Sequence, residues 1–247
     1  MEHQRLLAPA KLTVSLRVTG VRDDGYHLID AEMVSVDLCD ELEITDGDGL
    51  EVVEAATGLS VPVDDNNLVA VALRAVGRTA SVRLVKRIPA GAGLGGGSSD
   101  AAAILRWAGG VSAASAMAIG ADVAFCQVGG RARVTGIGEV VAALPAERRR
   151  FTLLTPPFGV STPVVYRAWD DLGGPTARGG NDLEPAAVAA YPELAEWRDA
   201  LSEASGVRAR LAGSGGTWFV AGAYPGVSHR NIRALVVDSV GADLPAL

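Results

Sequence analysis

Cysteine, histidine and aromatic residues are scarce in this chain of 247 residues. It contains two cysteines and three histidines, and aromatic residues make up 5% of it. Cys39 and Cys126 each stand in an apolar stretch, which favours buried thiols in a reducing compartment over a disulfide framework. The histidines lie far apart, without a His or Cys neighbour at metal-ligand spacing. The sequence therefore predicts neither a disulfide scaffold nor a zinc site built by the protein.

Excess positive charge and long apolar runs are also lacking. A formal net charge of -7 argues against a nucleic-acid or anionic-membrane surface, because clustered Lys and Arg bind such surfaces. The one dense basic run, Arg148 to Arg150, follows Glu147 and is interpreted as a solvated connection without a function. The first five residues lack the apolar core of a signal peptide, and Arg106 and Asp122 interrupt the Ala-rich stretch that follows the residue pair 98–99. We therefore expect a cytoplasmic protein that binds neither nucleic acid nor membrane. We further expect an enzyme with small-molecule substrates that is a monomer or weak homodimer.

The order of strand and helix signals predicts two parts. Hydrophobic residues make up 49% of the chain, as in globular proteins. Strands are expected at 6–18, 33–38 and 42–44, with turn formers around Asp40 between the last two. A helix is expected from Leu68, after the capping side chains at 64–67, to Gly77. A charged run before the apolar strand 151–154 marks the boundary, so we predict domains at residues 1–148 and 149–247.

The second part mixes helix and strand signals. Helices are expected near 163–169 and 192–203, strands near 207–211 and 218–220, and a final helix around 229–237. No repeat of fixed period is evident.

A strand at 82–86 runs into a glycine-rich loop, and an Ala-rich helix is expected to begin at the serine pair that ends the loop. Glycine dominates the loop, and almost no side chain in it exceeds a methyl group: Pro89, Ala90, Gly91, Ala92, Gly93, Leu94, Gly95, Gly96, Gly97, Ser98, Ser99. Such a run lets backbone amides surround an oxyanion. The helix that follows adds unpaired N–H groups and the positive end of its dipole. We therefore predict a polyphosphate site, rather than a flexible linker.

Two familiar phosphate motifs do not fit this loop. Gly91, Gly93 and Gly96 match G-x-G-x-x-G, but a Rossmann fingerprint needs a following βαβ unit with an acidic residue at a strand's end. Asp122 instead precedes its apolar run. Gly91 and Gly96 also have Walker A spacing, yet Gly97 occupies the place of the phosphate-neutralising Lys. The loop is therefore a phosphate nest of another kind.

Three further positions stand out, and the pattern alone leaves each open. Asp122 precedes the apolar residues 123–126, where it is either a strand-entry cap or a functional carboxylate. Lys11, inside an apolar strand, is either a snorkelling surface lysine, which the pattern favours, or a charge held in a cleft. Tyr26 and His27 follow a turn glycine and are typical of a loop pair with partly packed rings.

Four segments occur along the chain in this order: Pro9-Ala10-Lys11-Leu12, Gly25-Tyr26-His27, the loop 89–102 and Gly120-Ala121-Asp122-Val123. Shorter ones are Asn67-Leu68, Ser161-Thr162-Pro163, Asn181-Asp182-Leu183 and Ala212-Gly213-Ser214-Gly215. Together they resemble the GHMP kinase superfamily, and within it the family that phosphorylates 4-diphosphocytidyl-2-C-methyl-D-erythritol. The resemblance spans nearly the whole chain. It departs at Thr13, Asp100 and Ala124, where that family usually has Asn, Asn and Pro.

The resemblance implies an activity and a fold. The activity is ATP-dependent phosphorylation of the 2-hydroxyl of the erythritol part, a step of the non-mevalonate isoprenoid pathway. The fold is two-domain α+β, with an N-terminal domain like the second domain of ribosomal protein S5, a ferredoxin-like C-terminal domain, and the substrates between them. Two alternatives stay open: another GHMP kinase with a mevalonate-like or sugar-like alcohol as its substrate, and a non-catalytic nucleotide-binding relative.

The resemblance also implies roles at the reacting end. Asp122 is the base that takes the alcohol proton. Lys11 keeps this carboxylate ionised, orients it and stabilises the developing alkoxide. Magnesium is expected to travel with ATP, with Ser99 as a candidate protein contact, and no tightly bound prosthetic group is implied.

The resemblance also implies residues that bind the cytidine of the substrate, and further candidates exist for the adenine of ATP. The cytidine ring is expected to stack between Tyr26 and Tyr166, with a hydrogen bond at His27 and Thr162 nearby. The candidates for the adenine end are Asn67, Leu68 and Lys86, although a helix start and a strand end explain these three residues almost equally well.

Overall fold

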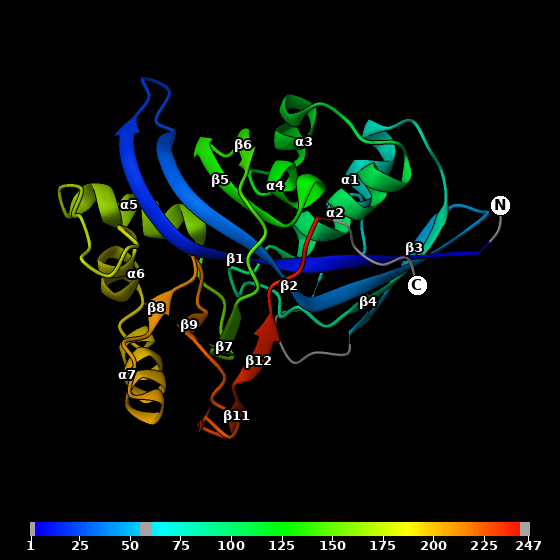
Figure 1. Cartoon of the computed structure of the whole chain (residues 1–247). Helices are drawn as coiled ribbons and strands as arrows, with labels where there is room; N and C mark the ends of the chain where they lie inside the picture. The colour runs from blue at the N-terminus through cyan, green and yellow to red at the C-terminus, as the bar shows by residue number, and fades with distance from the viewer. Residues whose placement is uncertain (1–2, 55–60, 243–247) are drawn as a thin grey trace.

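The computed structural model describes residues 3–54 and 61–242, and most of its strands form two sheets (Figure 1). The first sheet contains β1 (Gln4–Val21), β2 (His27–Thr45), β3 (Gly49–Glu54), β4 (Ser81–Lys86), β5 (Arg131–Gly136) and β6 (Val140–Ala143). Its order is β3-β4-β2-β5-β6, with β1 paired to β2; β3 and β4 are parallel and the other pairs antiparallel. The second sheet has the order β12-β7-β9-β8 and contains β7 (Arg150–Leu154), β8 (Arg210–Leu211), β9 (Trp218–Ala221) and β12 (Leu235–Asp238). A short ribbon of β10 (Ser228–His229) and β11 (Ile232–Arg233) completes the strands of the described ranges.

Helices lie along both parts of the chain. The first part holds α1 (Leu68–Ala75), α2 (Gly96–Trp107), α3 (Ala113–Ile119) and α4 (Val123–Val128), and the second holds α5 (Thr162–Asp171), α6 (Glu184–Ala190) and α7 (Leu194–Ser205). The predicted helix after residue 67 is confirmed: the Asn67 side chain accepts a hydrogen bond from the backbone N–H of Val69. The helices near 163–169 and 192–203 are confirmed as α5 and α7, whereas α3 and α6 were not predicted. Among the described residues, no helix combines the length and apolar composition that a membrane span requires.

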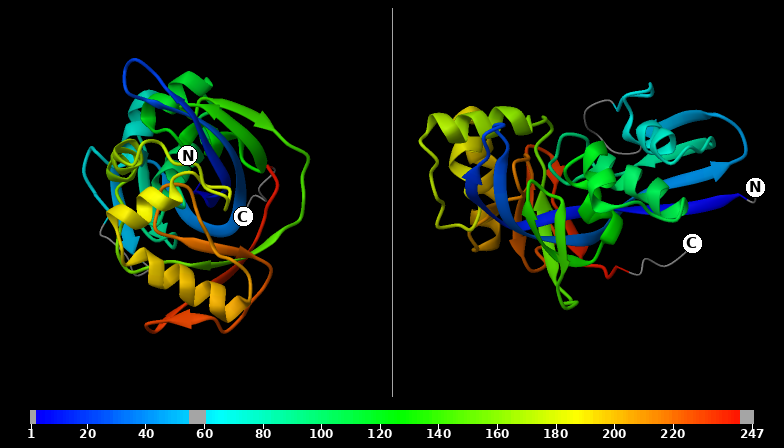
Figure 2. Two further views of the ribbon diagram at one scale, coloured as in Figure 1. Left: turned by 90° about the vertical axis from the view of Figure 1, so that its left-hand side faces the viewer. Right: turned by 90° about the horizontal axis from the view of Figure 1, so that it is seen from above.

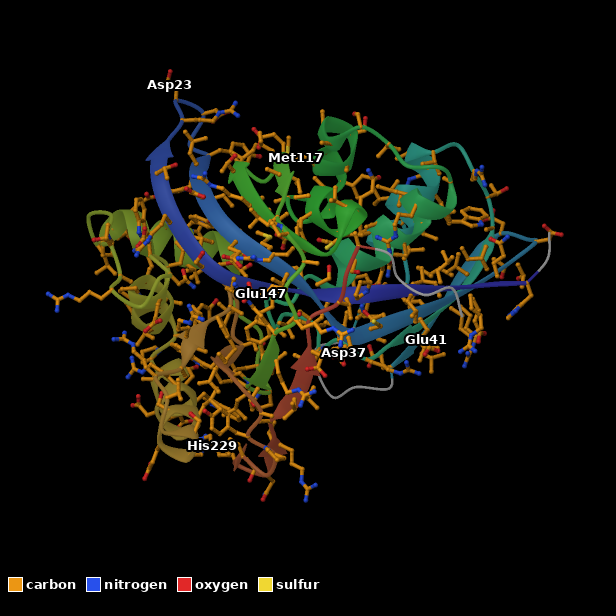
Figure 3. All side chains as sticks on the ribbon, in the orientation of Figure 1. Asp23, Asp37, Glu41, Met117, Glu147 and His229 are labelled. Atoms are coloured by element: carbon orange, nitrogen blue, oxygen red, sulfur yellow. The ribbon has the colours of Figure 1, made fainter. Side chains whose placement is uncertain are left out.

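The long hairpin of β1 and β2 runs through the whole molecule (Figure 1). Figures 1 and 2 show it curving across the whole structure, with its tip on the same side as α5. The predicted turn at the tip is confirmed: Gly25 has φ +85° and donates its N–H to the Arg22 carbonyl at 2.9 Å. Asp23 marks this tip in Figure 3. Such a long hairpin carries side chains from the phosphate loop to the far end of the molecule.

The predicted turn around Asp40 is wrong, because β2 runs unbroken to Thr45. Asp40 pairs with Ala8 on β1, and its buried carboxylate accepts the backbone N–H groups of Arg87 and Ile88. A turn-forming residue thus finds its hydrogen-bond partners on a neighbouring strand end. The carboxylate therefore stays inside a strand.

Apolar side chains from both parts meet along this hairpin. Helices α1 to α4 lie on one side of β1 and β2 and the second sheet on the other (Figure 1). One buried cluster joins β1, β2, the phosphate loop and the second sheet: Ala10, Leu12, Val14, Val34, Val36, Ile88, Ala92, Leu94, Phe151, Leu153, Ala212, Phe219 and Val237. Burial of this surface fixes the loop between the two sheets. The predicted boundary at 148/149 falls between β6 and β7, and the division into domains stays a prediction.

The predicted final helix around 229–237 is wrong. Arg230 and Asn231 have φ of 48° and 65° and form the turn of the β10–β11 ribbon. The residues that follow form β12, which pairs with residues 150–153 of β7, and the pairing partner of Val237 is Phe151. Branched side chains such as Val237 suit a half-buried strand, and the pairing partner lies 86 positions earlier in the chain, beyond the reach of local periodicity.

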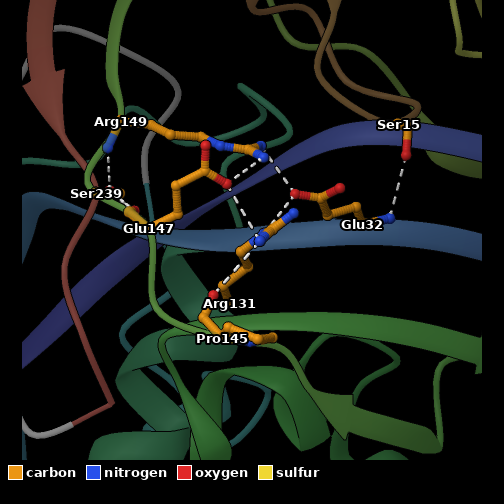
Figure 4. A network of polar contacts seen from close by, with 7 residues as sticks. All are labelled: Ser15, Glu32, Arg131, Pro145, Glu147, Arg149 and Ser239. Carbon is orange, nitrogen blue, oxygen red and sulfur yellow. Dashed lines mark hydrogen bonds and ion pairs between the residues drawn. The ribbon is translucent and has the colours of Figure 1, made fainter.

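The basic run at 148–150, which ends on the first residue of β7, has more partners than a solvated connection would. Figure 4 shows Arg149 and Arg131 converging on Glu32 of β2, each with a nitrogen 2.8 Å from the same Oε1. Arg149 also lies 2.7 Å from Glu147, and Arg150 pairs with Asp238 of β12 at 2.6 Å. The interpretation of this run as a solvated connection is therefore corrected: it ties the link between the sheets to β2, β5 and β12.

Candidate active site

A cavity of about 690 Å³ opens between the β1–β2 hairpin, α3, α5 and the turn after β8. Six side chains singled out from the sequence line it: Lys11, Tyr26, His27, Asp122, Thr162 and Tyr166. Ser98, at the end of the glycine loop, and Met117 of α3, labelled in Figure 3, line it as well. The structure thus brings the predicted reacting pair and the predicted cytidine-binding residues into one space.

Lys11 lies at the reacting end of this cavity. Its Nζ is 3.1 Å from Asp122 Oδ2 and 3.2 Å from Thr13 Oγ1, and 7% of its side chain is exposed. The alternative of a snorkelling surface lysine is therefore wrong, and the expected pair with Asp122 is present. The Thr13 hydroxyl, at one of the positions where the chain departs from the family it resembles, accepts a hydrogen bond from the ammonium.

Asp122 lies three residues after the end of α3 and directly before the start of α4. The apolar residues 123–126 form this helix, so the alternative of a strand-entry cap is wrong. The carboxylate makes no capping hydrogen bond to α4, and 31% of the side chain is exposed. It is therefore available to a group that enters the cavity.

The glycine loop approaches Lys11 closely. Gly91, Gly93 and Gly95 all have left-handed φ, at +69°, +78° and +69°. Lys11 donates its backbone N–H to the Leu94 carbonyl at 2.9 Å, and a Cβ at Gly95 would lie 2.6 Å from Lys11 Cγ. Only glycine fits there without displacing the lysine.

Helix α2 begins at Gly96, two residues earlier than predicted, because Gly95 serves as its N-cap instead of a serine. The first intrahelical bond runs from the Ser99 N–H to the Gly95 carbonyl at 2.8 Å. The amides of the first turn therefore have no partner within the helix. This geometry is the one expected for a phosphate site at a helix N-terminus.

The turn between β8 and β9, in the second part of the chain, packs against the glycine loop. A Cβ at Gly93 would lie 2.5 Å from Gly215 Cα, so the two backbones touch. Thr217 donates both its backbone N–H, at 3.1 Å, and its hydroxyl, at 2.8 Å, to the Ala92 carbonyl. The segment 212–215, singled out above for its sequence, and Thr217 after it thus hold the phosphate loop in place.

Lys86 does not face the cavity. Its buried ammonium donates to Asp40 and, at 2.6 Å, to Asp100 of α2, beneath the start of that helix. Burial alone would lower the pKa of Lys86, but the charges of Asp100 and Asp40 outweigh it and raise that pKa. Burial keeps the pKa of Asp100 well above its usual range, although Lys86 lowers it. The ammonium is therefore occupied, and the structure does not place it for the expected adenine contact.

The serine predicted to contact magnesium is also occupied. Ser99 is fully buried, and its hydroxyl donates to the Pro9 carbonyl at 2.7 Å, whereas Ser98 lines the cavity. Across the described ranges, no three His, Cys, Asp or Glu side chains are grouped so that they could hold a metal ion. Asn67 caps α1 and donates to the Pro62 carbonyl at 2.6 Å, and Leu68 begins that helix.

The far end of the cavity is aromatic. The rings of His27 and Tyr166 have centroids 4.6 Å apart, and Trp169 meets His27 edge-on at 5.5 Å. His27 Nε2 lies 2.8 Å from Asp170 Oδ1, while Tyr26 is 60% exposed at the rim. His27, rather than Tyr26, therefore lies against Tyr166, and burial raises the pKa of Tyr166.

Several lining residues were missed by the sequence reasoning. Thr162 Oγ1 lies 2.8 Å from Ser214 Oγ, which joins α5 to the turn at 212–215. Positions 162, 163, 166, 167 and 170 all line the cavity, as one face of a helix would. This spacing was a readable signal for Arg167 and Asp170, because the predicted helix already contained Tyr166.

Comparisons with known proteins agree with this fold and site. The GHMP kinases N terminal domain matches residues 66–143, which include the glycine loop and Asp122. A solved 4-(cytidine 5'-diphospho)-2C-methyl-D-erythritol kinase superposes with a TM-score of 0.75 at 30% identity, covering 96% of this chain and 99% of that one. A homoserine kinase from Cytophaga hutchinsonii shares the fold, with a TM-score of 0.64 at 20% identity over 98% of this chain and 95% of that one. These findings define the class: the fold is that of the GHMP kinases, which are ATP-dependent small-molecule kinases.

Sequence relatives narrow the class. The 4-diphosphocytidyl-2-C-methyl-D-erythritol kinase of Paracoccus denitrificans is 38% identical, covering 88% of this chain and 86% of the relative. That of Pelotomaculum thermopropionicum is 40% identical, covering 86% of this chain and 87% of the relative. The chain belongs to the 4-diphosphocytidyl-2-C-methyl-D-erythritol kinase family.

Proposed function

We propose that the chain transfers the γ-phosphoryl group of ATP to the 2-hydroxyl of 4-diphosphocytidyl-2-C-methyl-D-erythritol. The observation that carries this proposal is the Lys11–Asp122 pair, set at 3.1 Å where the glycine loop meets the cavity. A kinase must align a hydroxyl with the phosphoryl group, neutralise developing charge and accept a proton. This pair, next to a phosphate nest, has the groups for each task.

At the reacting end, Asp122 takes the proton of the attacking hydroxyl. Lys11, held by Thr13 and by the pairing of β1 with the loop, stabilises the alkoxide and the transferring phosphoryl oxygens. ATP enters as its magnesium complex, with its phosphates over the first turn of α2. Of the two loop serines, Ser98 rather than Ser99 has its position on the cavity side.

At the far end, the cytosine ring stacks between Tyr26 and Tyr166, and His27 supplies a hydrogen bond. What supports this proposal is that all three side chains line the cavity and that Asp170 orients the His27 ring. Tyr26, exposed at the rim, has the freedom to close over an entering ring. Thr162, held by Ser214, lies on the same face of α5 as Tyr166.

An ADP-release assay with a panel of alcohols tests the proposal. With ATP and magnesium, the purified protein is expected to release ADP with 4-diphosphocytidyl-2-C-methyl-D-erythritol and not with mevalonate, homoserine or galactose. The physical reason is that these three alcohols carry no aromatic base and so gain none of the base-stacking energy of the aromatic end. Turnover of one of the three without turnover of the cytidine compound would overturn the substrate assignment. Absence of ADP release with all four would favour a non-catalytic nucleotide-binding protein.

A further inference from the structure

The charged side chains of the cavity are unequally partnered. Four Asp, Glu, Lys or Arg residues line the cavity: Lys11, Asp122, Arg167 and Asp170. Lys11 and Asp122 neutralise each other at 3.1 Å, and Asp170 is 2.8 Å from the His27 ring. The Arg167 guanidinium has neither an ion pair nor a hydrogen bond within the part of the chain that the structure describes. One cation of the cavity thus remains without a counter-charge.

The position of Arg167 is set by α5. Residues 162, 163, 166 and 170 of this helix line the cavity, so Arg167 belongs to the helix face that looks into it and not to the opposite one. It directly follows Tyr166, whose ring lies against His27 at the aromatic end. The guanidinium therefore originates beside the base-binding end of the cavity.

The proposed substrate needs a cation at this place. Its diphosphate joins the cytidine to the erythritol, so it must lie between the aromatic end and the Lys11–Asp122 pair. There it enters a space that already holds the carboxylates of Asp122 and Asp170. Lys11 is engaged by Asp122, which leaves Arg167 to offset the added negative charge. Guanidinium groups suit this task, because their planar N–H fork matches phosphate oxygens.

We propose that Arg167 binds the diphosphate of the cytidine substrate and so makes the cavity selective for a nucleoside diphosphate over an uncharged nucleoside. This inference rests on the proposed function and adds to it a residue that determines specificity. Arg167 acts in binding and takes no part in proton transfer. Its removal should therefore raise the KM for the substrate far more than it lowers kcat.

A binding cycle tests the inference without turnover. Cytidine and cytidine 5'-diphosphate are titrated by calorimetry into the wild type, Arg167→Gln and Arg167→Lys. The wild type is expected to bind the diphosphate roughly 10- to 100-fold more tightly than cytidine, as a charge-assisted contact allows. Arg167→Gln should lose most of this preference while its affinity for cytidine stays unchanged, and Arg167→Lys should keep part of it. A general loss of structure would weaken both ligands alike.

Arg178 provides the matched control. Like Arg167, it is an exposed residue whose guanidinium has no partner in the described structure, and it lies in the loop after α5, outside the cavity lining. Arg178→Gln should retain the full preference for the diphosphate. A preference that survives in Arg167→Gln, that is absent from the wild type, or that Arg178→Gln loses equally would overturn the inference.

The ADP-release assay separates this inference from the proposed function. A wild type that turns over the cytidine compound, together with an Arg167→Gln variant of unchanged KM for it, would overturn the role of Arg167 alone. A wild type that does not turn over the compound would overturn the proposed function, whatever the binding cycle shows. The KM for ATP should be the same in the wild type and in Arg167→Gln.

Discussion

Asp122→Asn is expected to lower kcat by roughly 100- to 10 000-fold, because the amide cannot accept the proton of the attacking hydroxyl. The KM for ATP should stay close to that of the wild type, since the phosphates are held by the loop and α2. The substitution keeps the size of the side chain, and the carboxylate makes no hydrogen bond to α4 that folding would miss. Steady-state kinetics with the cytidine substrate gives both parameters.

Asp171 offers a matched control for this measurement. It is an exposed aspartate at the end of α5 and does not line the cavity. Asp171→Asn should leave kcat unchanged. An undiminished kcat in Asp122→Asn would remove Asp122 as the base, and an equal loss in both variants would point to a general effect of charge.

Lys86→Met is expected to destabilise the protein by about 3–5 kcal/mol, because it leaves the two buried carboxyl groups of Asp40 and Asp100 without the cation they share. Asp40 and Asp100 are both almost completely buried, and Lys86 donates to each of them. Methionine fills a similar volume, so the loss reports the charge and not a cavity. The free energy of unfolding follows from urea denaturation.

A second substitution identifies the cause of this loss. In the Lys86→Met background, Asp100→Asn removes one of the two buried carboxyl groups left without their cation and should recover part of the lost stability. Asp100 Oδ1 has no hydrogen-bond partner, so the amide breaks no contact at that atom. A loss below about 1 kcal/mol in Lys86→Met, or no recovery in the double variant, would contradict the account of a buried charge cluster.

The local parts of this site could be predicted from the sequence. The glycine loop, the helix after it and the Asn67 cap depend on neighbouring residues, which is why their patterns were readable. The resemblance added the Lys11–Asp122 pair, whose members are 111 positions apart. Without it, the pattern favoured an exposed lysine and left Asp122 undecided between two roles.

The parts set by strand register could not be predicted. Lys86 meets Asp40 only because β4 pairs with β2, so the pairing of its ammonium with a buried carboxylate was not foreseen, and its role at the adenine end stays a prediction. The last strand, β12, forms because β7 offers it a partner. That partner is far away in the sequence, so the local pattern alone wrongly indicated a helix. The partner of His27 lies on α5, 143 positions away. In each case the deciding contact was long-range.

The contact between the two halves explains how the loop keeps its shape. Gly93 touches Gly215, and Thr217 donates twice to the Ala92 carbonyl. Leu94, buried in the cluster between the sheets, anchors the middle of the loop. A loop so rich in glycine would otherwise be costly to order. Its support from the second sheet therefore belongs to the phosphate site as much as the loop itself does.

The structure of the reaction product tests the central claim most directly. The purified protein is incubated with ATP, magnesium and 4-diphosphocytidyl-2-C-methyl-D-erythritol, and the product is analysed by phosphorus and carbon NMR. The account predicts one new phosphomonoester, coupled to the carbon that bears the 2-hydroxyl, with the diphosphate intact. A product phosphorylated at another hydroxyl, or an unchanged cytidine compound in the presence of ATP, would contradict it.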